Sequence, residues 1–209
     1  MASSNLTRSS IKSRYIMITG LPGVGKTTLI KKIHENLVKE GFQCNGFFTE
    51  EVRSNGHRIG FDVITTDKNR GQLARVSDNS NDVPVSRQTN FKVGQYTVNI
   101  SSFELTALPS LYYPTKTKEE RKLIYLVDEI GKMELFSQSF IQAVKKLMSQ
   151  TNVYLIATIP VPKGRPLALV EELRNNPLSH VVQVTHQNRN SILSEVMTLV
   201  HSVVASQVT

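Results

Sequence analysis

Cysteine and long apolar runs are the two features that this chain most clearly lacks. Its one cysteine, Cys44, cannot form an internal disulfide or a cysteine-ligated metal cluster. Such sparing use of cysteine is typical of a reducing intracellular compartment, so we expect a cytoplasmic location. No apolar run approaches the ~20 residues that are needed to cross a bilayer, and we expect no membrane association.

Acidic residues are also scarce relative to basic ones. The chain has 25 Lys and Arg against 17 Asp and Glu, which gives a formal net charge of +8. This balance favours an anionic ligand or partner, such as a phosphorylated small molecule or a nucleic acid. No nucleic-acid-binding motif accompanies it, and the basic stretch of Arg53, His57 and Arg58 is more simply explained as a solvated hairpin tip than as an RNA-binding patch.

Length and composition favour one globular domain. At 209 residues, with 39% hydrophobic and 20% charged residues, the chain is able to bury a real core. Residues 1–14 are basic and contain no acid, as organellar transit peptides do, but the segment is short. We expect a disordered tail at 1–14 and a single, monomeric domain at 15–209.

The first half of the chain predicts a strand, a loop and a helix, followed by antiparallel strands. The strand is Tyr15–Ile18, and apolar residues at helical spacing extend over Lys26–Lys39. Two β-rich segments, Gly46–Arg53 and His57–Thr65, are joined around Asn55-Gly56, a pair that favours a type I′ turn. An antiparallel hairpin is therefore expected there.

Further strands and a helix are predicted between the hairpin and the second half. Gln72–Val76 and Lys92–Ile100 have strand composition. Ser101 followed by Glu104 has the form of a capping box and predicts a short helix that ends near Pro109.

The second half alternates between strand and helix patterns. Alternation of this kind implies parallel crossover units, so the fold class is α/β, a three-layer sandwich with a mostly parallel sheet and an antiparallel hairpin insertion. The predicted strands are Leu123–Val127, Val153–Ile159 and Val181–Val184, and the predicted helices are Glu134–Met148, Pro166–Arg174 and Asn190–Val204.

A phosphate-binding loop follows the first strand and opens the first helix. The pattern G-x-x-x-x-G-K-[ST] is matched at every fixed position, and its glycines allow successive backbone N–H groups to point at a phosphate. Lys26 would add a full positive charge at the β- and γ-phosphates, and the helix N-terminus would add the positive end of its dipole. The residues expected to bind the nucleotide here are Gly20, Leu21, Pro22, Gly23, Val24, Gly25, Lys26, Thr27 and Thr28.

Two adjacent acids end the buried strand at 123–127. Asp128 is placed to hold Mg²⁺ together with the Thr27 hydroxyl, directly or through water. Glu129 is favoured as the group that accepts a proton from the water attacking the γ-phosphorus; the alternative is that it merely supports the metal shell.

Other polar residues follow the later strands. Thr158 ends a strand and would hydrogen-bond the attacking water or the γ-phosphate, or have a purely structural role. Lys163 and Arg165 lie in a Pro- and Gly-containing loop, where they would neutralise charge in the transition state or simply be solvated. Asn188 and Arg189, after the last strand, are expected to contact the base.

With these residues identified, the sequence resembles the nucleoside-triphosphatase family first described from thermophiles. The resemblance implies a RecA-like P-loop core, Mg²⁺ dependence and slow hydrolysis of several NTPs to NDP and phosphate. It also implies the roles given above for Lys26, Thr27, Asp128 and Glu129. Departures from the family are expected in the tail before Tyr15 and in the loop at 77–90. The stretches that carry the resemblance are Gly20–Thr28, Gly46–Arg53, Arg58–Val63, Asp128–Leu135 and Pro160–Glu172.

Two alternatives to hydrolysis remain open. Small P-loop kinases share the loop and the chain length, and Glu50, Glu51 and Arg53 lie where a phosphoryl acceptor would bind. A nucleotide-dependent module that binds RNA or protein would use hydrolysis as a timer. A GTPase switch is disfavoured because no Asn-Lys-x-Asp segment occurs in the chain.

Overall fold

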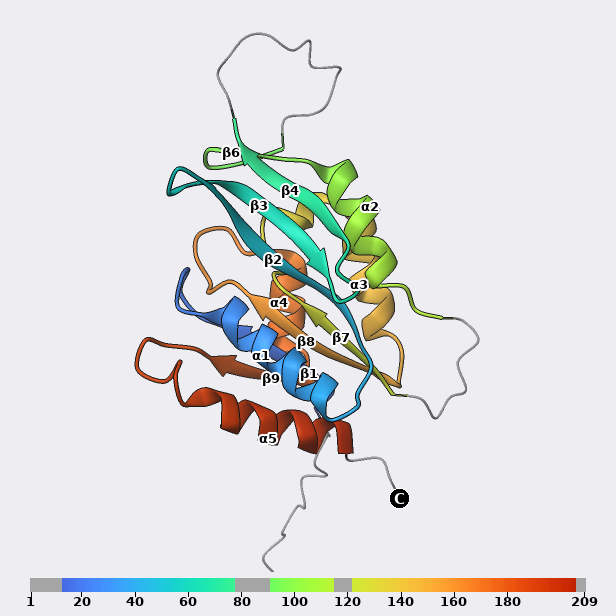
Figure 1. Cartoon of the computed structure of the whole chain (residues 1–209). Coiled ribbons are helices and arrows are strands. Elements are labelled where there is room, and N and C mark those ends of the chain that lie inside the picture. The colour runs from blue at the N-terminus through green and yellow to red at the C-terminus, as the bar shows by residue number, and fades with distance from the viewer. Residues whose placement is uncertain (1–12, 78–90, 115–121, 206–209) are drawn as a thin grey trace, which may run out of the picture.

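A nine-stranded sheet runs through the protein and separates two layers of helices (Figure 1). The computed structural model describes residues 13–77, 91–114 and 122–205; the predicted tail at 1–14 and loop at 77–90 lie almost wholly outside these ranges. The strands are β1 (Tyr15–Thr19), β2 (Cys44–Ser54), β3 (His57–Thr65), β4 (Arg70–Val76), β5 (Lys92–Val93), β6 (Tyr96–Val98), β7 (Leu123–Val127), β8 (Val153–Ile159) and β9 (Ser179–Gln183).

Helices cover both faces of the sheet. Helices α1 and α5 pack on one face, and α2, α3 and α4 pack on the other. This arrangement confirms the predicted three-layer α/β sandwich. The helices are α1 (Lys26–Lys39), α2 (Ile100–Ser110), the 3₁₀ turn η1 (Glu134–Phe136), α3 (Gln138–Met148), α4 (Ala168–Asn175) and α5 (Ile192–Ala205).

The sheet has a parallel half and an antiparallel half. Its strand order is β5-β6-β4-β3-β2-β7-β8-β1-β9, and the five strands from β2 to β9 in this order pair in parallel. Their carboxyl ends therefore meet along one edge of the sheet, which we call the carboxyl edge, on the left in Figure 1. Because loops at this edge of an open α/β sheet build the ligand sites, the edge is where the site is sought.

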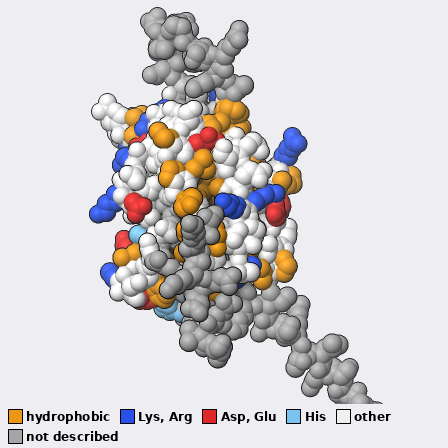
Figure 2. Space-filling model, turned by 90° about the vertical axis from the view of Figure 1, so that its right-hand side faces the viewer, with side chains coloured by type: hydrophobic (Ala, Val, Ile, Leu, Met, Phe, Trp, Pro, Cys, Tyr) orange, Lys and Arg blue, Asp and Glu red, His pale blue; other side chains and the backbone are white. Residues whose placement is uncertain are grey.

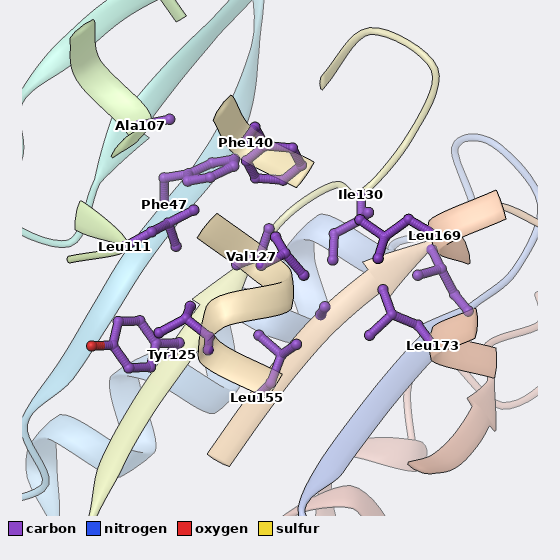
Figure 3. Close-up of a cluster of buried hydrophobic side chains, with 14 of the residues drawn as sticks. Phe47, Ala107, Leu111, Tyr125, Val127, Ile130, Phe140, Leu155, Leu169 and Leu173 are labelled. Carbon is purple, nitrogen blue, oxygen red and sulfur yellow. The ribbon is translucent and has the colours of Figure 1, made fainter. Parts of the chain in front are cut away.

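The larger core lies between the sheet and the α2–α4 layer (Figure 3). Phe47 from β2 and Phe140 from α3 stack in a tilted pair with ring centroids 6.0 Å apart. Phe140 also meets Phe103 of α2 edge to face, at 5.4 Å. Aromatic side chains from three elements thus fix how two helices sit on the sheet, close to the end of β7.

The predicted hairpin is confirmed, and it belongs to a longer meander. Asn55 (φ 49°) and Gly56 (φ 79°) both adopt the positive φ that a type I′ turn requires. Strands β3, β4, β6 and β5 continue the antiparallel pairing outward from β2.

Two predictions between β4 and β7 were wrong. The segment 92–100 is not one strand, because a turn at Gly94 (φ 58°) divides it into β5 and β6. The cap of α2 is Asn99 rather than Ser101: the Asn99 side chain accepts a hydrogen bond from Ser102 N at 3.0 Å. Asn caps helices as well as Ser does. Because Asn99 lies two residues before Ser101, α2 begins earlier than predicted, at Ile100.

The predicted helix at 134–148 is interrupted. Its first residues form η1, and Ser137 is extended (φ −82°, ψ 113°) and caps α3 by accepting a hydrogen bond from Phe140 N at 2.9 Å. The later elements α4, β9 and α5 each begin within two residues of their predicted starts.

The described residues contain no helix long and apolar enough to cross a membrane. On the face opposite the carboxyl edge (Figure 2), basic and acidic side chains are interspersed around apolar ones. The excess of positive charge is therefore not gathered into a basic stripe on this face.

Candidate active site at the carboxyl edge

The phosphate-binding loop connects β1 to α1 in the conformation that its glycines permit. Gly23 (φ 74°) and Gly25 (φ 112°) occupy the left-handed region, and Gly25 is the N-cap of α1. A Cβ on Gly20 would lie 2.5 Å from the carbonyl oxygen of Val184, which follows β9. The loop therefore begins in a gap beside β9 that only glycine fits.

Lys26 is buried although it carries a charge. Its Nζ donates hydrogen bonds to the carbonyl oxygens of Gly20 at 3.0 Å and Leu21 at 3.4 Å, so the ammonium group lies against the loop itself. Thr27 is half-buried at the start of α1, and Thr28 is exposed. The predicted loop residues thus form one anion-binding turn at the N-terminus of a helix.

Asp128 is held from both sides by threonine hydroxyls. It is 1% exposed, its Oδ1 accepts from Thr158 Oγ1 at 2.6 Å, and its Oδ2 accepts from Thr49 Oγ1 at 3.1 Å. Thr158 was predicted from its position at a strand end. Thr49 was not, because only the pairing of β2 with β7 brings it there.

The approach of β2 to β7 depends on a glycine. Gly46 has φ 116°, and a Cβ on it would lie 1.9 Å from the carbonyl oxygen of Leu126. The register that follows pairs Phe47 with Val127, which places Thr49 beside Asp128.

Glu129 faces both the loop lysine and the neighbouring acid. Burial raises the pKa of Glu129, the charge of Lys26 opposes that rise, and Asp128 adds to it. A carboxyl with a raised pKa, influenced by the lysine of a glycine-rich loop, is suited to act as a general base.

A second glutamate, missed by the sequence analysis, lies behind Glu129. Glu134 of η1 is 4% exposed, and its Oε2 accepts a hydrogen bond from Gly131 N at 3.0 Å. Burial, and next the charge of Glu129, raise the pKa of Glu134 to about 8. In the sequence, Glu134 stands at the start of the predicted helix at 134–148, where an acid is common. Nothing in the local pattern therefore indicated that it belongs to the site.

The remaining predicted residues lie on two loops of the same edge. Lys163 and Arg165 are exposed on the β8–α4 loop, and no ion pair involving either occurs within the described ranges. The Asn188 side chain accepts from Thr185 N at 2.7 Å and donates to Gln183 O at 2.9 Å, so its polar atoms brace the β9–α5 loop. Arg189 is exposed beside it.

The donor set at this edge suits a hard divalent ion bound together with phosphate. Over the chain as described, no three His, Cys, Asp or Glu side chains cluster to hold a metal by themselves. One buried carboxylate, Asp128, and one hydroxyl, Thr27, match the few protein ligands that Mg²⁺ takes when phosphate oxygens and water complete its shell.

Known proteins share this sequence and fold over nearly the whole chain. A family model described as NTPase matches residues 15–197. The human cancer-related nucleoside-triphosphatase is 48% identical over 190 residues, which cover 91% of this chain and 98% of the relative. Nucleoside-triphosphatase THEP1 of Aquifex aeolicus is 40% identical over 187 residues, which cover 88% of this chain and 97% of the relative.

Two solved structures have a similar fold. A solution structure of a human cancer-related nucleoside triphosphatase matches with a TM-score of 0.79 at 48% identity, covering 91% of this chain and 98% of that one. The crystal structure of THEP1 from A. aeolicus matches with a TM-score of 0.72 at 39% identity, covering 88% and 98%. The chain therefore belongs to the NTPase family and is an enzyme of the nucleoside-triphosphatase class.

Proposed function

We propose that this enzyme binds a magnesium-nucleoside triphosphate at the carboxyl edge and hydrolyses it to the diphosphate and phosphate. The observation that carries the proposal is the convergence of a phosphate loop and two acids at the carboxyl edge: the charges of Lys26, after β1, and of Asp128, after β7, both act on Glu129. The printed names of the relatives support the reaction class.

Each part of the site has a distinct role in this reaction. The backbone N–H groups of the loop and the Lys26 ammonium hold the phosphates, as at other helix N-termini. Asp128 and Thr27 would hold Mg²⁺, which when bound neutralises charge on the phosphate oxygens. Glu129 accepts the proton of the attacking water, and Thr158 keeps the Asp128 carboxylate in one orientation.

The exposed loops supply the remaining proposed contacts. Lys163 and Arg165 lie on a loop with Gly164 at φ 68°, and a flexible cation there would neutralise charge that develops in the transition state. Arg189 would contact the base. The relatives' printed name, nucleoside-triphosphatase, specifies no base, and we propose broad base specificity for this chain as well.

The residues considered for a phosphoryl acceptor are already paired with one another. Glu51 accepts hydrogen bonds from Arg53 at 2.6 Å and Arg58 at 2.8 Å, and Glu50 accepts from Arg70 at 3.0 Å. Such pairing favours water over a second substrate as the phosphoryl acceptor.

Phosphate release from a panel of NTPs, with and without Mg²⁺ and with and without hydroxyl acceptors, tests the proposal. We expect slow, magnesium-dependent release from ATP, GTP, CTP and UTP that no acceptor accelerates. Glu129→Gln should keep nucleotide affinity and lose about 10²-fold or more in rate. Acceptor-dependent ADP formation without phosphate release would instead identify a kinase.

A further inference from the structure

Glu134 is a buried acid for which folding alone offers no reason. Its side chain is 4% exposed, and within the described residues no Lys, Arg or His forms an ion pair with it. Burying an ionisable carboxyl without a cation is costly, and a leucine or methionine would fill the same space at no such cost. We therefore expect the acid at this position to have a function other than packing.

Glu134 and Glu129 lie against the same glycine. The position that a Cβ on Gly131 would take is 3.2 Å from Glu134 Oε2 and 3.3 Å from Glu129 Oε1. The two carboxyl groups thus occupy one side of Gly131, where a Cβ would require each of them to shift by a few tenths of an ångström. We call these three residues the carboxyl cluster.

Hydrogen bonds hold the loop of the carboxyl cluster at three points. Ile130 N donates to Thr158 O at 2.9 Å, and Leu135 N donates to Gly131 O at 3.0 Å. The third bond, from Gly131 N to Glu134 Oε2 at 3.0 Å, is the one made by a side chain. It fixes the backbone two residues after Glu129 and so limits the directions in which the Glu129 carboxyl points.

We propose that Glu134 is a positioning residue: by accepting the Gly131 N–H and occupying the space beside Glu129, it holds the Glu129 carboxyl toward the attacking water. The inference rests on the function proposed above, in which Glu129 is the base. The influence of Glu129 on the pKa of Glu134 supports the closeness of the two groups. Orientation of a base within a few tenths of an ångström is a recognised source of rate.

Two substitutions of Glu134 separate positioning from packing. Glu134→Gln keeps an oxygen that accepts the Gly131 N–H, whereas Glu134→Met keeps the volume and removes the acceptor. We expect kcat for ATP to fall about 10-fold or more in Glu134→Met and to stay within about threefold of wild type in Glu134→Gln, with KM and nucleotide Kd unchanged in both. Wild-type kcat in Glu134→Met would overturn the inference.

Ser137→Ala is the matched control in the same segment. Ser137 is fully buried, and its hydroxyl caps α3 and donates to Glu104 at 2.6 Å. Its one hydrogen bond to the carboxyl cluster, from its backbone N to Glu134 O at 3.0 Å, does not involve the hydroxyl that Ser137→Ala removes. We expect Ser137→Ala to lower the melting temperature and leave kcat per folded molecule unchanged. An equal loss of kcat in Ser137→Ala and Glu134→Met would mean that loosening the segment is sufficient, which would also overturn the inference.

A double-mutant cycle shows whether Glu134 acts through Glu129. If it does, Glu129→Gln combined with Glu134→Met should be no slower than Glu129→Gln alone. Fully additive losses would contradict the inference while leaving hydrolysis intact, whereas absence of turnover in the wild-type enzyme would refute the proposed function itself. Should Glu134→Met fail to fold, Gly131→Ala decides the matter. Its methyl group crowds both carboxyl groups, at 3.2 and 3.3 Å, and should lower kcat by shifting the Glu129 carboxyl; an unchanged kcat would overturn the inference.

Discussion

Thr158 and Asp128 are joined by a hydrogen bond of 2.6 Å between two buried side chains, with the threonine hydroxyl donating to Oδ1. The residues end two neighbouring parallel strands, β8 and β7. Because Thr49 donates to the other carboxylate oxygen at 3.1 Å, both oxygens of Asp128 have fixed directions. The carboxylate is therefore oriented before any ligand binds.

Loss of the Thr158 hydroxyl should raise the Mg²⁺ concentration that phosphate release requires. Thr158→Val keeps the shape of the side chain and removes a buried hydrogen bond to a charged acceptor, a contact worth about 1.5–3 kcal/mol. We expect the Mg²⁺ concentration for half-maximal phosphate release to rise about tenfold, and Thr158→Ser to restore it. Thr49→Val should have a smaller effect, since Thr49 is half-buried and its bond is longer. An unchanged magnesium dependence in Thr158→Val would contradict the role of Thr158 in orienting the Asp128 carboxylate for the metal.

Lys26→Ala should abolish turnover. Without the ammonium group the β- and γ-phosphates lose their only full positive charge from the loop itself, and equilibrium binding of Mg-ATP should become undetectable by calorimetry. Lys32→Ala, which removes an exposed charge from the same helix, is the control and should bind and hydrolyse as wild type does. Tight Mg-ATP binding by the Lys26→Ala variant would contradict the assigned role of the loop.

The ion pairs of Asp62 should support the antiparallel half of the sheet. Its buried carboxylate accepts from Arg70 Nε at 2.7 Å and from Arg75 at 2.6 Å. Asp62→Asn leaves Arg75 without its carboxylate partner and leaves Arg70 with Glu50 alone, so urea unfolding should show a loss of about 2 kcal/mol. Glu172→Ala breaks an exposed pair with Lys145, and there we expect less than about 1 kcal/mol. Similar losses in the two variants would show that burial of Asp62 adds nothing.

Stability should fall with rising pH because of Glu134. Its pKa of about 8 in the folded protein lies above the value of 4.5 for an unperturbed glutamate, so the folded state binds the proton more tightly. The contribution of protonated Glu134 to the free energy of unfolding is fully present below about pH 4.5 and is lost by about pH 8. Between these values the free energy of unfolding falls by up to about 1.4 kcal/mol per unit of pH. Glu134→Gln does not titrate, so its free energy of unfolding relative to wild type should increase between pH 5 and pH 8. Parallel pH profiles for the two proteins would contradict the raised pKa.

Local sequence patterns were sufficient to predict the structure wherever residues close together in the sequence decide it. The phosphate loop needs glycines and a lysine at set intervals, and Asn55-Gly56 needs positive φ at two adjacent residues, so both were predicted correctly. The strand alternation likewise indicated the layered fold. The capping box at Ser101 failed because Asn99, also a good cap, lies two residues earlier, and its backbone N is bonded to Leu73 O of β4 at 2.8 Å.

The sequence by itself determined the glycine-rich loop between β1 and α1, the acid pair after β7 and the three-layer architecture, because each depends on residue types at short spacing. Only the tertiary structure decided that Thr49 and Thr158 donate hydrogen bonds to Asp128 and that the Glu134 and Glu129 carboxyl groups lie on the same side of Gly131. Those contacts depend on the register between β2, β7 and β8 and on the interruption before α3. Register and packing are set by the balance of many distant contacts, which no short stretch of sequence contains.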